Sequence, residues 1–148
     1  MAPARALAAA ALALLATFAW AQAPSKDIFK GRIKAGLYEV RTDVDMSGVP
    51  GVAKDAAKQT QTLQRCLTKA EVDKGMESDK NCPIKSHTVS GNTVQFAADC
   101  KDGSKTDMRM TFTASGYEAE MKSVGSQGGK PYRSVIRTQS RYLGACKK

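Results

Sequence analysis

Residues 93–122, TVQFAADCKDGSKTDMRMTFTASGYEAEMK, decide the fold of this chain. Apolar and polar side chains alternate along three stretches of it, residues 93–100, 106–113 and 117–122, and a short glycine-containing turn separates each stretch from the next. A period of two residues is typical of a β-strand with one buried face. Because turns this short join neighbouring antiparallel strands, this part of the sequence predicts a β-meander.

Extended segments of the same kind lie on both sides of this meander. Residues 84–89 mirror residues 93–100 about the turn at 90–92, which predicts a β-hairpin. Three further segments are extended by the same criteria: 37–46, 59–67 and 132–143. Two connections have their own patterns, since residues 52–58 are compatible with one or two helical turns and residues 125–129 with a flexible turn.

These patterns predict a mainly β protein with a single antiparallel sheet of about seven strands. A strongly twisted sheet of this size tends to curl, so we expect a barrel or half-barrel. Thr68 and Glu71 have the spacing of a capping box, and Gly75 suits the end of a helix. The sequence therefore also predicts one short helix, which would close one side of the curled sheet.

Four cysteines, which permit three pairings, predict two structural disulfides. Cys82 and Cys100 stand at the two ends of the predicted hairpin, where their Cα atoms come within the ~5.5 Å that a disulfide requires. That geometry favours a Cys82–Cys100 bond and leaves Cys66 with Cys146. No C-x-x-C pair is present, and one histidine with widely spaced cysteines does not make a zinc site.

The beginning of the sequence has the pattern of a secretory signal peptide. Arg5 precedes an apolar run over residues 6–18, which is shorter than the ~20 residues that cross a bilayer, and a small-x-small site follows at 19–21. We expect a soluble bacterial protein, periplasmic or secreted, with no transmembrane segment in the mature chain. Its predicted parts are a signal peptide (1–21), a flexible N-terminal arm (22–34) and one disulfide-braced β domain (35–148).

The formal net charge of +9 suggests anionic partners. Lysine and arginine are nevertheless scattered among acidic residues, which also fits a generally solvated basic surface. The clearest candidates for a surface that meets an acidic envelope component are three arginines on one face of the last predicted strand: Arg133, Arg137 and Arg141. An exported location excludes nucleic acid as a partner.

No set of residues has the pattern of a catalytic or metal site. His87 is the only histidine, no G-x-S-x-G segment is present, and His87 is predicted on the strand face opposite Ile84. The closely spaced carboxylates Asp43 with Asp45 and Glu118 with Glu120 fall on predicted solvent faces, whereas a hydrolytic pair needs one carboxyl in an apolar pocket. We therefore expect no enzyme, no cofactor and no metal.

One predicted sheet face is rich in methionine and aromatic residues: Met108, Met110, Phe112, Tyr117 and Met121. These side chains suit a packed core, a cavity for an apolar ligand, or a soft metal such as Cu(I). Two functions remain open. One is a non-catalytic binding module for a small apolar or amphipathic ligand. The alternative is an envelope interaction or inhibitor-type module that acts through its basic surface.

Several short motifs, taken in order with the cysteines, resemble one family. They are GLYEV at 36–40, CLT at 66–68, GNTV at 91–94 and RYLG at 141–144, together with Cys82, Cys100 and Cys146. Over residues 34–147 the chain resembles an exported bacterial family called domain of unknown function 3617. The resemblance implies a small exported proteobacterial protein whose cysteines form a framework, and it implies no catalytic residue.

Overall fold

The computed structural model describes residues 28–76 and 79–147, which form one antiparallel sheet of seven strands and one short helix. The elements are β1 (Gly36–Gly48), β2 (Lys58–Leu67), α1 (Lys69–Lys74), β3 (Ile84–Ser90), β4 (Thr93–Asp99), β5 (Lys105–Thr113), β6 (Gly116–Gln127) and β7 (Lys130–Gly144). This confirms the predicted fold class. The signal peptide predicted over residues 1–21 lies outside the described residues.

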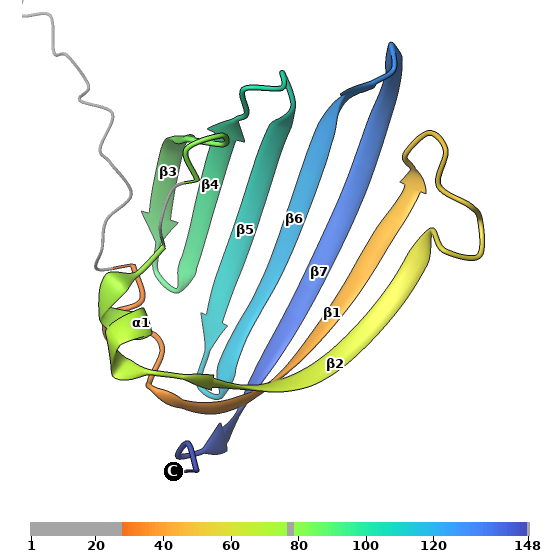
Figure 1. Ribbon diagram of the computed structural model, residues 1–148. Helices are drawn as coiled ribbons and strands as arrows, with labels where there is room; N and C mark the ends of the chain where they lie inside the picture. The colour runs from red at the N-terminus through yellow and green to blue at the C-terminus, as the bar shows by residue number, and fades with distance from the viewer. Residues whose placement is uncertain (1–27, 77–78, 148) are drawn as a thin grey trace, which may run out of the picture.

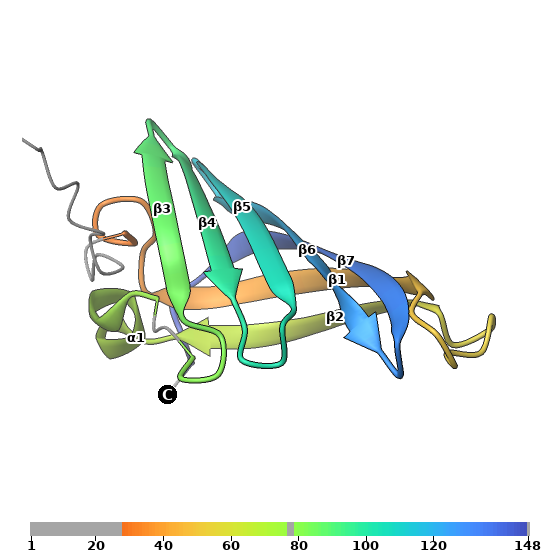
Figure 2. The same ribbon diagram turned by 90° about the horizontal axis from the view of Figure 1, so that it is seen from above.

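The sheet curls without closing, so the fold is a half-barrel (Figures 1 and 2). Its hydrogen-bonded order is β2-β1-β7-β6-β5-β4-β3, in which β2 and β3 are the two edge strands. The predicted meander runs from β3 to β7, and β7 then pairs with β1, which joins the β1–β2 hairpin to the meander. Helix α1 follows β2 and lies at one end of the half-barrel, near β3 (Figure 2).

The pairing of β7 with β1 requires close approach at Gly36. Tyr38 and Tyr142 are opposite each other in the register and their rings meet edge to face, with centroids 5.3 Å apart. A Cβ atom on Gly36 would lie 2.3 Å from Cε2 of Tyr142 and 2.5 Å from the carbonyl oxygen of Gly144. Since the φ angle of Gly36 is also +156°, this position accepts only glycine without a shift of the strands.

The hydrophobic core lies on one face of the sheet, under the segment that precedes β1 and under α1. Its buried members come from both layers and are Ile28, Ile33, Tyr38, Val72, Val94, Phe96, Met110 and Phe112. Val72 is the buried side chain of α1. Strands β1, β4 and β5 supply the sheet residues because every second side chain of a strand faces the same side.

Residues 28–34 correct part of the prediction of a flexible arm over residues 22–34, whose first six residues lie outside the described residues. Ile28 is only 2% exposed and Ile33 9%. A tight turn between them, in which the amides of Arg32 and Ile33 donate to the carbonyl of Phe29, turns both isoleucines toward the sheet. The apolar residues of this segment have no period of two or 3.6, which is why the sequence pattern did not indicate packing.

Two connections also differ from the sequence patterns. Residues 54–56 form a turn and residues 52–58 contain no helix, and the amide of Met46 donates to the carbonyl of Ala57 across this connection. Strand β6 extends to Gln127, so only Gly128 and Gly129 make the turn to β7. Their φ angles of +58° and +75° are those of a two-residue hairpin turn.

Both disulfides have the predicted partners. Cys82 and Cys100 join the residues flanking the β3–β4 hairpin, with Cα atoms 4.0 Å apart, and Cys66 on β2 is bonded to Cys146 beyond β7, with Cα atoms 5.6 Å apart. The sequence separations are 18 and 80 residues. On loop entropy alone, bonds of these spans stabilise a fold by roughly 3 and 4.5 kcal/mol.

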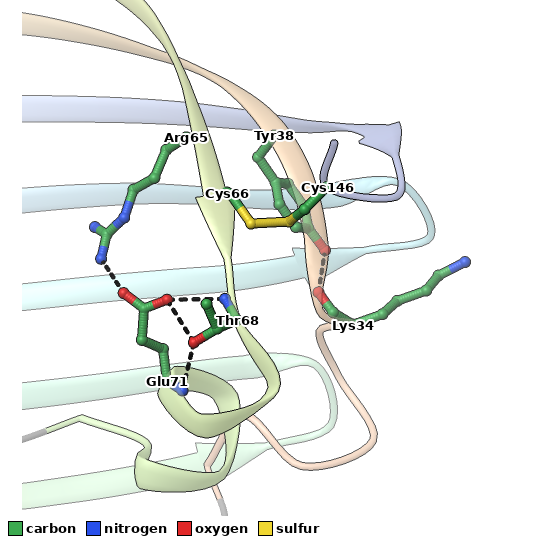
Figure 3. Close-up of a disulfide and its surroundings, with 7 residues drawn as sticks. All are labelled: Lys34, Tyr38, Arg65, Cys66, Thr68, Glu71 and Cys146. Carbon is green, nitrogen blue, oxygen red and sulfur yellow. Dashed lines mark hydrogen bonds and ion pairs between the residues drawn. A yellow bond between two sulfur atoms is a disulfide. The ribbon is translucent and has the colours of Figure 1, made fainter. Parts of the chain in front are cut away.

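Helix α1 begins with the predicted capping box. The Thr68 hydroxyl accepts a hydrogen bond from the Glu71 amide, and the Glu71 carboxylate accepts one from the Thr68 amide at 2.8 Å (Figure 3). The same carboxylate accepts hydrogen bonds from Arg65 and from the Thr68 hydroxyl. The Thr68 amide first, and then these two donors, lower the pKa of Glu71 from 4.5 to about 2.

Replacing Val94 by alanine should lower the free energy of unfolding by about 2 kcal/mol, because Val94 is fully buried and its two methyl groups fill the core. Val89, its partner in the β3–β4 register, is 46% exposed and provides a matched control. Val89→Ala should change stability by about 0.5 kcal/mol or less. Urea denaturation of the oxidised proteins measures both values, and equal losses would contradict this description of the core.

Replacing Glu71 by glutamine should make the free energy of unfolding depend less on pH in the acidic range. Because folding lowers the pKa of Glu71, its carboxylate stabilises the fold above pH 4.5, and this contribution is lost as the pH falls toward about 2. The wild-type protein should therefore be more stable than Glu71→Gln at neutral pH, and the difference should shrink across that range. Urea denaturation midpoints at a series of pH values test this, and a constant difference would contradict it.

Candidate functional site

The five side chains predicted to line an apolar site share one face of β5 and β6. They are Met108, Met110, Phe112, Tyr117 and Met121, and the register places Phe112 opposite Tyr117 and Met108 opposite Met121. Met110 and Phe112 are buried core members, and Met108 and Tyr117 pack against that core. Met121 is half-buried beside Met108. The structure thus brings the set together, and most of its surface fills the core.

A cavity of about 250 Å³ opens where α1 and the segment before β1 meet the sheet. Its apolar wall comes from four parts of the chain and consists of Phe29, Ile33, Leu67, Met110 and Tyr117. Two residues of the predicted set, Met110 and Tyr117, therefore border this cavity. It exists because one short helix and one turn cover only part of the curled apolar face.

Charged side chains border the same cavity on the side of β2 and α1. Arg65 of β2 is ion-paired with Glu71 of α1, with Nη2 and Oε1 2.8 Å apart (Figure 3). Lys74 also contributes to the lining. The Arg65 and Glu71 side chains are 62% and 40% exposed, so the pair lies at the mouth of the cavity and not in its interior. The site therefore combines an apolar wall with a polar rim.

Cys66, which lies between Arg65 and Leu67, holds this wall of the cavity in place through a disulfide. Cys66 is bonded to Cys146, so the end of β2 is tied to the end of β7 across the first residues of β1 (Figure 3). Nearby, the buried Tyr38 hydroxyl donates a hydrogen bond to the Lys34 carbonyl at 2.9 Å. Burial raises the pKa of Tyr38, so its phenol stays neutral at physiological pH.

The three arginines predicted to meet an acidic partner lie on the other face of β7, away from this cavity. Arg137 is ion-paired with Glu120 of β6 at 2.9 Å, and Arg141 with Glu39 of β1 at 3.0 Å. Arg133 is exposed. Because neighbouring strands place carboxylates beside two of the arginines, this face carries charges of both signs.

Two carboxylates on the outer face, Asp43 and Glu120, have lowered pKa values. The Thr60 hydroxyl and Arg41 hold the pKa of Asp43 below its usual value, and Lys122 does the same for Glu120. A general acid at neutral pH needs a shift in the opposite direction.

The alternation predicted that His87 lies on the face opposite Ile84. In the structure the two side chains lie on the same face. A register shift between Ile84 and Ser86 turns His87 to the face of Phe96, and the two rings stack with centroids 6.4 Å apart. The half-buried imidazole packs there and does not border the 250 Å³ cavity.

Most of the cavity wall was not predicted from the sequence. Phe29 and Ile33 belong to the segment predicted as an arm, and Arg65, Leu67 and Lys74 were not proposed as site residues. One signal was available for β2. Arg65 is two residues from both Leu63 and Leu67, so the three side chains share one strand face, which carries leucines and a cation.

The described residues hold neither a helix long and apolar enough to span a membrane nor a group of three or more His, Cys, Asp or Glu side chains suited to a metal ion. Among known proteins, the family model described as "Protein of unknown function (DUF3617)" matches residues 33–146. No curated protein and no solved structure matches the chain. The match covers most of the sequence and all seven strands of the sheet, so the chain belongs to the DUF3617 family.

Proposed function

We propose that this protein is a non-catalytic binding module that holds a small apolar or amphipathic molecule in the cavity bordered by Met110 and Tyr117. The observation that carries the proposal is the cavity itself, about 250 Å³ with a largely apolar wall. A cavity of ~150 Å³ already binds benzene, and small-molecule sites begin at ~300 Å³. A molecule larger than one aromatic ring therefore fits this cavity, whereas most cofactors are too large for it.

A binding role fits the side chains better than catalysis does. A catalytic site needs a nucleophile and a base, or two carboxyl groups with separated pKa values. Among the described residues that border this cavity, the one carboxylate is Glu71, which is already paired with Arg65 and has a pKa of about 2, so it is a poor proton donor or acceptor at neutral pH. His87 packs on Phe96 instead.

The proposed location of the protein is the periplasm or the exterior of a bacterial cell. Two disulfides support it, because such bonds persist in oxidising compartments. The alternative function, an interaction with an acidic envelope component through Arg133, Arg137 and Arg141, has less support, since two of these arginines already have carboxylate partners on the same face.

Filling the cavity should abolish uptake of an apolar probe. We expect the neutral fluorophore phenylnaphthylamine to bind the wild-type protein and Met110→Phe to weaken this binding at least tenfold, about 1.4 kcal/mol. Met110 borders the cavity, so a larger ring there occupies the space of the probe. Fluorescence titration measures the affinity.

Met108→Phe is the matched control, because Met108 lies on the same face of the same strand, two residues from Met110, and does not border the cavity. It should bind the probe as the wild type does. Overpacking by either substitution costs about 1–3 kcal/mol of stability, so urea denaturation accompanies each titration to show that the variants are folded. The proposal would be overturned if the wild-type protein did not bind the probe, or if Met110→Phe and Met108→Phe bound it with equal affinity.

A further inference from the structure

One buried hydroxyl next to the cavity has no partner. Ser140 of β7 is 9% exposed, and its Oγ forms no hydrogen bond among the residues that the structure describes. An unpaired buried hydroxyl is unfavourable, and native proteins contain few of them. The Ser140 side chain borders a small cavity of about 30 Å³, whose other walls are Tyr38, Val40, Arg65, Leu67 and Tyr117.

This small cavity adjoins the larger one. Arg65, Leu67 and Tyr117 border both, so Ser140 lies directly behind side chains that line the larger cavity. Arg65 remains able to bind such a molecule, because a guanidinium has five N–H donors and the bond to Glu71 occupies one nitrogen.

The chemistry of this corner selects an anionic acceptor. Arg65 offers only donors, and the Ser140 hydroxyl is able to donate. A carboxylate oxygen accepts both, and charge-assisted bonds of this kind are the strong ones.

We propose that the ligand is a small amphipathic carboxylic acid. Its carboxylate lies between Arg65 and Ser140, and its apolar body lies among Phe29, Ile33, Leu67 and Met110. This assignment rests on the proposed function and adds the class of ligand to it. It also gives a role to Ser140, which a purely apolar ligand would leave unpaired.

The test compares octanoate with octanol, which share an alkyl chain and differ in charge. Isothermal titration calorimetry of the wild-type protein should show octanoate binding at least tenfold more tightly. Ser140→Ala and Arg65→Gln should each remove most of this preference while octanol binding stays within about twofold. Ser140→Ala should remain folded, because it removes a buried hydroxyl without a partner.

Ser134→Ala is the matched control, a serine of β7 that the alternation places on the same face as Ser140 and that does not border either cavity. It should keep the wild-type preference. Two results would together overturn the assignment of a carboxylic acid: equal affinities for octanoate and octanol, and no effect of Ser140→Ala. They would mean that the Ser140 hydroxyl is hydrated and does not contact the ligand, and the proposed function would stand. Binding of phenylnaphthylamine without binding of octanoate would have the same meaning. A protein that binds none of the three would overturn both proposals.

Discussion

The pairing of β7 with β1 is the constraint on which the rest of this structure depends. Without it, the five-stranded meander β3 to β7 would be separate from the hairpin β1–β2, and an isolated two-stranded hairpin is marginally stable at best. The pairing brings Tyr38 next to Tyr142 and requires a residue without a Cβ atom at Gly36. It also sets the curl of the sheet, and thus the shape of the space that the helix and the preceding segment must fill.

The helix and the segment before β1 do not fill that space completely. Aromatic residues make up only 6% of the chain, and α1 contributes one buried side chain, Val72. The segment that contains Ile28 and Ile33 supplies most of the remaining cover. This cavity opens to solvent beside the exposed Arg65–Glu71 pair, and a larger side chain there would cover more of the apolar face. Retention of a cavity beside Met110 and Tyr117 is therefore the feature that most needs a functional explanation.

The sequence allowed most of the fold to be predicted, and much less of the candidate site. Strands such as β5 were recognisable because an alternation of two residues is a local signal, and the Cys82–Cys100 bond followed from one local hairpin. The partner of β7 was not predictable, because alternation tells which side chains share a face and not which strand lies beside it. The same holds for the cavity. Whether Met110 fills a core or borders a space depends on how far α1 reaches, and Arg65 became a site residue because α1 follows the end of β2 and places Glu71 beside it.

The two disulfides are nested, with Cys82–Cys100 inside the span of Cys66–Cys146. Oxidation in order of synthesis would join Cys66 to Cys82, the next cysteine to emerge. The native pattern can then be reached only by thiol–disulfide exchange, in which a free thiolate attacks the wrong bond. A cell that makes this protein therefore needs more than an oxidant. It needs either a hairpin that forms early enough to protect Cys82 or an isomerase that corrects the first bond.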